Sequence, residues 1–322
     1  MDDNILLCDE VLIMKEDDEI CILKNPNNYK KDCEETFYIC LNKELDFLPQ
    51  FGYVTRLRSS GLLFSRFKSV QSIIKSQCRL NLSFETVFNA VSFLDRFISI
   101  NQCHGWKDWM MELLSVACLS VASKFGETEN HTLHEIQMKG LKLSYSFEPK
   151  LIQRMELNLM KVLNWRLMST TSFSYVELLT WNITSNHFLT VGSINLLLTT
   201  LLDVEFVEFR PSIVAMASLM CIIKKKLHYS TDLGYDLDDY LAYITTLIPQ
   251  DHMDDLMKCE EKMSHDHGSY MNGTIIPSSP NTVLGGGMED VHDLCNFFKI
   301  SEHDLMKPNM VRFSGVKRKR EK

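Results

Sequence analysis

The sequence contains few of the residues that interrupt helices, with 13 glycines and eight prolines among its 322 residues. No apolar run reaches the ~18 residues that a membrane span requires, and no basic segment precedes an apolar stretch as in a secretory signal. The ten cysteines are scattered singly, and none belongs to a C-x-x-C pair. These absences exclude a collagen-like chain and a small disulfide scaffold, and they predict free thiols, a reducing compartment and no membrane partner.

Charge is spread unevenly along the chain, whose net charge is −8 at pH 7. The first 50 residues hold 13 acidic and five basic residues, whereas the last six hold five basic residues and one acidic residue. The run Lys317, Arg318, Lys319 and Arg320 is typical of a nuclear import signal, and a solvated charged end is the alternative. We therefore expect a nuclear protein, with shuttling to the cytoplasm left open.

Apolar residues recur at helical spacing from about residue 60 to residue 263. Two segments, 106–125 and 211–226, are apolar on almost all sides, so each predicts a helix buried within a group of others. Their recurrence indicates that one helical unit is repeated, and the predicted fold class is all-α. The predicted helices cover residues 65–78, 84–100, 106–125, 149–163, 171–182, 187–205, 211–226, 237–247 and 251–263.

Motifs that carry catalysis are missing from the sequence. It contains no phosphate-binding loop, nucleophile elbow or zinc-protease motif. The pairs His131/His134 and His265/His267 lack the spacing of metal ligands. We therefore predict no cofactor, no metal and no catalytic residue, although an all-α enzyme with an unrecognised site stays open as an alternative.

Three charged residues lie beside predicted apolar faces, where an unpaired charge is costly. Asp95 and Glu156 lie at the edges of apolar stripes, and Lys124 ends the apolar helix over 106–125. Each of them either forms an internal ion pair or awaits groups of a partner protein. The sequence pattern leaves both interpretations open.

The acidic leader contains the motif L-x-C-x-E at Leu6, Cys8 and Glu10. In an extended strand these three side chains face one way, because successive residues alternate between the two faces. They would present an apolar anchor, a small soft group and a carboxylate to the groove of a partner, with the surrounding acidic residues steering the encounter.

Several segments together resemble the cyclin box. They are Val91–Ile98 (VSFLDRFI), Leu114–Phe125 (LSVACLSVASKF), Ile152–Leu157 (IQRMEL) and Leu163–Arg166 (LNWR). With the L-x-C-x-E motif the chain resembles the D-type cyclins, and two further stretches are similar to their plant branch. These stretches are Phe209–Ser212 (FRPS) and Ser279–Leu284 (SPNTVL).

The resemblance implies two tandem five-helix cyclin folds with flexible N- and C-terminal extensions. It implies a regulatory subunit, not an enzyme, that binds and activates a cyclin-dependent kinase and directs it to a retinoblastoma-type pocket protein at the G1/S transition. The implied domains are residues 1–52 (an acidic flexible leader with one short helix near Glu35 to Leu41), 53–167 (the N-terminal cyclin box), 168–265 (the C-terminal cyclin fold) and 266–322 (a flexible tail with a basic end).

Site residues follow from the same resemblance, position by position. Lys124, Phe125 and Glu156 match the residues with which the family binds its kinase. Arg66 and Asp95 match an internal salt bridge between the first two box helices. The motif residues Leu6, Cys8 and Glu10 match the site that binds pocket proteins, and Leu113 matches a core leucine of the box. Ser279 precedes a proline, and the resemblance implies a phosphorylation site linked to turnover there, with an unmodified linker serine as the alternative.

The first box helix departs from the family pattern. Many cyclins carry an apolar patch there that docks substrate and inhibitor peptides, and the matching positions here are Ser65, Lys68, Ser69 and Ser72. Each change removes apolar burial worth about 1.5–3 kcal/mol, which puts the docking of substrates and kinase inhibitor proteins at this patch in doubt.

An alternative function is that of a cyclin-fold transcription adaptor. An adaptor would require a zinc ribbon and a basic surface that faces DNA, and the sequence offers neither a paired C-x-x-C nor a basic middle segment. We therefore expect no nucleic-acid partner.

Overall fold

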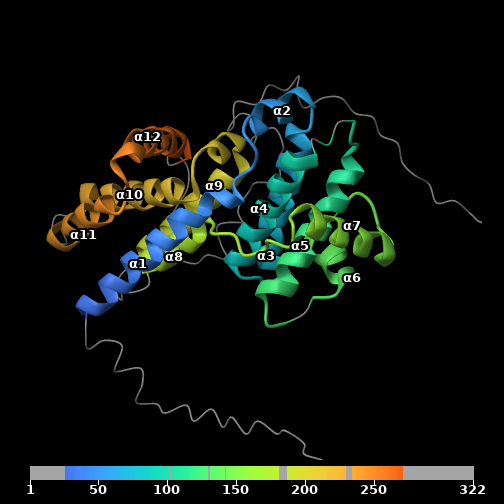
Figure 1. The fold of residues 1–322 in the computed structure, drawn as a ribbon, viewed down its shortest axis with the longest axis horizontal. Coiled ribbons are helices and arrows are strands. Elements are labelled where there is room, and N and C mark those ends of the chain that lie inside the picture. Colours follow the sequence, from blue (N-terminus) through green and yellow to red (C-terminus); the bar gives the residue numbers. More distant parts are fainter. Residues whose placement is uncertain are drawn as a thin grey trace, which may run out of the picture.

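The computed structural model describes residues 26–101, 103, 105–129, 131–141, 143–180, 187–229 and 234–270. All regular structure in these ranges is helical, and no strand occurs in them, which confirms the all-α fold class (Figure 1). Within the same ranges, no helix combines the length and the apolar character needed to cross a membrane.

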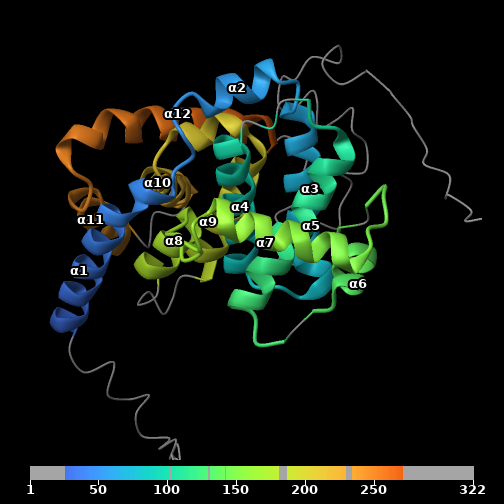
Figure 2. The same cartoon turned by 45° about the vertical axis from the view of Figure 1, so that its right-hand side comes forward.

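The first helical unit is built around α5 (Asp108–Gly126). Its side chains are buried from Leu113 to Ser123, as expected for a helix that is apolar on all sides. It packs against α3, α4 and α7, which surround it in Figures 1 and 2. The bounds of its neighbours are α2 (Tyr53–Ser59), α3 (Leu63–Leu80), α4 (Phe84–Asn101), α6 (Leu133–Glu135), the π-helical turn η4 (Ile136–Leu141) and α7 (Pro149–Val162).

The second unit repeats this plan around α10 (Pro211–Tyr229). Residues Ile213 to Met220 of α10 are buried, and the helix packs against all four other helices of its unit. Those helices are α8 (Ser172–Thr180), α9 (His187–Leu202), α11 (Gly234–Thr246) and α12 (Met253–Tyr270), with the 3₁₀ turns η5 (Val204–Glu208) and η6 (Gln250–His252) between them.

Residues 26–44 correct the prediction of a flexible leader. They form the 19-residue helix α1 (Pro26–Glu44), which is followed by the 3₁₀ turn η3 (Leu45–Phe47). A proline starts the helix, and Cys33, Phe37 and Leu41 recur every four residues and are buried on one face. The predicted short helix near Glu35 to Leu41 lies inside α1, but the rest of α1 was not predicted, because the acidic residues and the KNPNNYKK segment outweighed this narrow apolar stripe.

Two smaller corrections concern helix bounds. No helix was predicted at residues 133–141, where α6 and η4 form a helical segment of the first unit. The last helix was predicted to end at residue 263, whereas α12 continues to Tyr270. In both views, α1 lies beside α8, at the end of the molecule that is far from α6 (Figures 1 and 2).

Candidate functional site

Lys124 and Glu156, two of the three costly charges, bind each other across the first unit. Lys124 lies in the last turn of α5 and Glu156 in the middle of α7, and the Lys124 Nζ lies 2.7 and 2.8 Å from the two carboxylate oxygens. The Glu156 side chain is only 9% exposed, whereas that of Lys124 is 49% exposed. An ammonium group has three N–H donors, so one donor of Lys124 stays available to an acceptor outside the protein.

Apolar side chains lie next to this pair in sequence and face solvent. Phe125 follows Lys124 and is 50% exposed, and Leu157 follows Glu156 and is 42% exposed. Exposed large apolar side chains beside a partly buried charge pair are typical of a protein–protein interface. The surface around Lys124 and Glu156, with Phe125 and Leu157, is termed the α5/α7 surface below.

The second unit contains a pair of the same construction, which was not predicted from the sequence. Lys224 in α10 and Glu260 in α12 lie 2.5 Å apart, with side chains 47% and 10% exposed. The sequence signal was available, because Lys224 ends a strongly apolar stretch of α10 as Lys124 does in α5. This second pair offers a natural control for the first, since it has the same charges, burial and helix positions in its unit.

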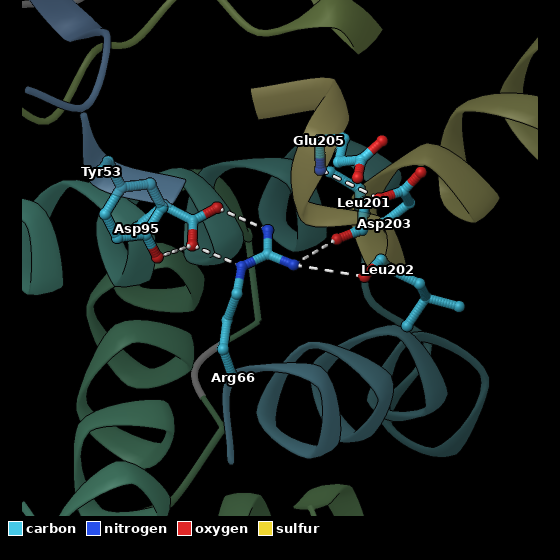
Figure 3. A network of polar contacts seen from close by, with 7 residues as sticks. All are labelled: Tyr53, Arg66, Asp95, Leu201, Leu202, Asp203 and Glu205. Carbon is cyan, nitrogen blue, oxygen red and sulfur yellow. Dashed lines mark hydrogen bonds and ion pairs between the residues drawn. The ribbon is translucent and has the colours of Figure 1, made fainter. Parts of the chain in front are cut away.

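The third costly charge, Asp95, lies in a buried network with Arg66 (Figure 3). Arg66 Nε and Nη2 donate to the two oxygens of Asp95 at 2.8 and 2.7 Å, and Tyr53 Oη donates to Asp95 at 2.7 Å. The remaining donor, Arg66 Nη1, reaches the carbonyl oxygens of Leu201 and Leu202 at the end of α9. Arg66 thus connects α3 and α4 of the first unit to the second unit.

The charges in this network stabilise one another. Burial alone would lower the pKa of Arg66, but Asp95 and its hydrogen bonds raise that pKa above the ordinary value. Burial, together with the nearby Asp95 carboxylate, raises the pKa of Tyr53 well above 10. The guanidinium is therefore charged and the phenol neutral throughout the physiological range.

Replacing Tyr53 with phenylalanine tests this arrangement through pH. Since the pKa of Tyr53 is raised by folding, its contribution to stability is present below the unfolded-state pKa of about 10 and is lost as the pH rises above it. We expect Tyr53→Phe to cost about 1–2 kcal/mol at pH 7 and to show a smaller loss of stability above pH 10 than the unmodified chain. Urea unfolding at pH 7 to 11 measures both effects, and parallel stability curves for the two chains would contradict the assignment.

A second, partly exposed charge network also joins the two units. Arg58 in α2 pairs with Glu205 in η5 at 2.7 Å. Lys262 in α12 binds Glu205 as well and lies 3.1 Å from Asp203. Figure 3 shows Asp203 and Glu205 close to the buried Arg66. The turn η5 is therefore fixed by charges from both units.

Some of the other predicted site residues lie in the helices of the first unit, and the rest lie outside the described residues. Leu113 is buried in α5. On α3, where the sequence departs from the family's apolar patch, Ser65 and Ser69 are buried. The hydroxyl Oγ of Ser65 donates a hydrogen bond to Asp108 at 2.6 Å, and Lys68 Nζ lies 4.5 Å from the centre of the Phe64 ring. Outside the described residues lie Leu6, Cys8, Glu10, Ser279, Lys317, Arg318, Lys319 and Arg320.

Family comparison matches both helical units. The family model "Cyclin, N-terminal domain" matches residues 35–168, and "Cyclin, C-terminal domain" matches residues 168–275. The chain belongs to the cyclin family. The two units described above are thus the two cyclin folds, and the first match begins inside α1.

Individual relatives place the chain near the plant D-type cyclins. It is 34% identical over 187 residues to Cyclin-D1-1 of Arabidopsis thaliana, covering 56% of this chain and 55% of that protein. It is 42% identical over 142 residues to Putative cyclin-D7-1 of Oryza sativa subsp. japonica, covering 44% and 41%. The chain therefore spans about half the length of these two relatives.

Among solved structures, a chain in the "Structure of the CAK complex form Chaetomium thermophilum bound to ATP-gamma-S" is 17% identical. The alignment covers 85% of this chain and 84% of that chain, with a TM-score of 0.41.

Proposed function

We propose that this cyclin binds and activates a cyclin-dependent protein kinase through the α5/α7 surface. The observation that carries the proposal is the Lys124–Glu156 pair, in which a nearly buried carboxylate holds a half-exposed lysine with one free donor, next in sequence to two exposed apolar residues. No described residue needs to perform chemistry in this role, because the chain acts as a regulatory subunit of a serine/threonine kinase complex.

Activation would be allosteric. An active kinase holds a lysine of its β3 strand against a glutamate of its mobile αC helix. A cyclin that contacts αC only in this position stabilises the active arrangement. Shifting a kinase from 1:99 to 99:1 active requires about 5.5 kcal/mol of differential binding, which an interface with several buried apolar anchors and a charge pair can supply.

We further propose that Leu6, Cys8 and Glu10 direct the kinase to a retinoblastoma-type pocket protein and so promote G1/S entry. The positions Ser65, Lys68, Ser69 and Ser72 support this division, because two buried serines, an exposed lysine and a half-buried serine present no apolar side chain to a docking peptide. Kinase inhibitor proteins remain candidate partners elsewhere on the complex.

The leader motif can be tested apart from the kinase site. The double variant Leu6→Ala/Cys8→Ala is expected to reduce binding to a pocket-protein fragment by about 100-fold or more, since two anchors are lost. Binding to the kinase should stay unchanged, because the α5/α7 surface is untouched. Fluorescence anisotropy with the labelled fragment measures the first and calorimetry the second. Unaltered affinity for the fragment would refute pocket-protein docking through this motif.

Two further proposals concern the chain ends. Lys317, Arg318, Lys319 and Arg320 would direct the protein to the nucleus, and phosphorylation of Ser279 would mark it for turnover. A reporter protein that carries residues 313–322 and still distributes evenly through the cell would contradict the first. A Ser279→Ala chain with unaltered half-life would contradict the second.

A further inference from the structure

Glu44, the last residue of α1, is a buried carboxylate in the second cyclin fold. Its side chain is 0% exposed. It accepts hydrogen bonds from Tyr175 Oη of α8 at 3.1 Å and from the backbone N–H and hydroxyl of Ser212 at 3.0 and 2.9 Å. The Arg210 guanidinium lies 3.8 Å away.

Ser212 lies in the first turn of α10, the central helix of the second fold. The N–H groups of a first helical turn have no acceptor within the helix, and a carboxylate that accepts one of them also interacts favourably with the helix dipole. Glu44 therefore caps α10, although the whole first cyclin fold separates the two residues in sequence. Moving α1 away would leave the buried donors of Tyr175 and Ser212 unpaired.

The rest of α1 is held along the same side. Phe37 packs edge-on against the Tyr175 ring, with centroids 5.2 Å apart, and Cys33 Sγ lies 3.7 Å from the carbonyl oxygen of Leu178. Both partners belong to α8, which lies beside α1 in Figures 1 and 2. The helix is thus fixed at its end and along its buried stripe.

The residues that follow Glu44 bind the first fold instead. Asp46 pairs with Arg166 at 2.5 Å. The Phe47 ring lies 5.1 Å from the guanidinium of Arg96 and 5.2 Å from that of Arg166. Residues 44–47 therefore contact both folds, and they fix the direction of α1 relative to the fold that carries the α5/α7 surface.

We propose that Glu44 is a positioning residue, which makes α1 a rigid mount for the leader and sets where a docked pocket protein is presented to the kinase. The inference rests on the proposed function. Only residues 11–25 separate the motif from α1, and they reach about 50 Å when fully extended. Because α1 leaves the molecule beside α8, the docked protein would approach the kinase from the side of the second fold.

Releasing α1 would lengthen the connection between the two folds and the docked protein. It would then run from residue 11 to about residue 44, and the effective concentration falls roughly as the −3/2 power of this length. The predicted loss in docking-assisted phosphorylation is therefore about threefold to fourfold. The phosphorylation of a short peptide substrate without a docking segment would not change.

The test compares Glu44→Ala with Glu35→Ala in the full chain bound to its kinase. Glu35 is a matched control, because it lies on the same helix, its carboxylate is exposed, and among the described residues its ion pair is with Lys31. We expect Glu44→Ala to speed hydrogen exchange in α1 and to raise the KM for a pocket-protein fragment about threefold to fourfold, with the KM for a short peptide unchanged. Glu35→Ala should change none of these.

Two outcomes would overturn the proposal: unaltered exchange in α1 of the Glu44→Ala chain, or faster exchange with no change in the KM for the fragment. If Glu44→Ala does not fold, Tyr175→Phe removes one donor to Glu44 while keeping the ring against Phe37, and the same shifts are expected at smaller size. Failure of the proposed function would look different. The kinase bound to the unmodified chain and the kinase bound to the Leu6→Ala/Cys8→Ala variant would then phosphorylate the fragment equally well.

Discussion

Replacing Lys124 with alanine is expected to weaken kinase binding by about 30-fold or more, equivalent to about 2 kcal/mol. The substitution removes the one half-exposed cation of the α5/α7 surface and its free N–H donor. It also leaves the carboxylate of Glu156, which is 9% exposed, without its partner. Isothermal titration calorimetry of the purified chain with the kinase measures the loss.

The variant Lys224→Ala separates a loss of kinase contacts from a loss of protein stability. That substitution also leaves a nearly buried glutamate, Glu260, without its ion-pair partner in the equivalent helices of the second fold. We expect the two variants to lower the free energy of unfolding by similar amounts and only Lys124→Ala to weaken kinase binding. Equal losses of affinity in both variants would show that the first pair acts through stability alone.

Replacing Arg66 with alanine is expected to give the largest loss of stability in the chain, about 3–5 kcal/mol. Asp95 would be left buried with only the Tyr53 hydroxyl, and two carbonyl groups of α9 would lose their donor. A loss of this size is a large part of the 5–15 kcal/mol that stabilises a typical domain. Urea unfolding followed by circular dichroism measures it.

Arg58→Ala provides the comparison for this prediction. Arg58 also joins the two folds through a salt bridge with Glu205, but the side chains of both residues are about half exposed. Its loss should cost less than about 1 kcal/mol, as is usual for a surface pair. If Arg66→Ala cost no more than Arg58→Ala, the buried network would not hold the folds together.

The helical architecture could be predicted where the pattern was simple. The fully apolar segments at α5 and α10 identified both central helices, and each predicted end lay within three residues of the observed one. The missed helix α6 had a readable start signal. Thr132 and Glu135 form a capping box, with the spacing T-x-x-E, but the short π-helical turn after it has no helical repeat to recognise.

Other features could not be predicted from local sequence. The burial of Glu44 depends on donors from Tyr175 and Ser212, more than 130 residues away in sequence. From sequence alone, a glutamate at the end of an acidic segment is predicted to be exposed to solvent, because only the tertiary fold brings its hydrogen-bond donors together. The sequence pattern also could not decide whether Asp95, Lys124 and Glu156 form internal ion pairs or bind a partner protein. The pairing of Lys124 with Glu156, for example, requires the packing of α5 against α7.

Kinase activation by the α5/α7 surface is tested most directly by reconstitution. A purified cyclin-dependent kinase is assayed on a pocket-protein fragment with and without the chain, and with its Lys124→Ala/Glu156→Ala double variant. We predict that the unmodified chain raises the phosphorylation rate by a large factor and that the double variant, folded by circular dichroism, does not. Equal rates with and without the chain, or full stimulation by the double variant, would contradict kinase activation through this surface.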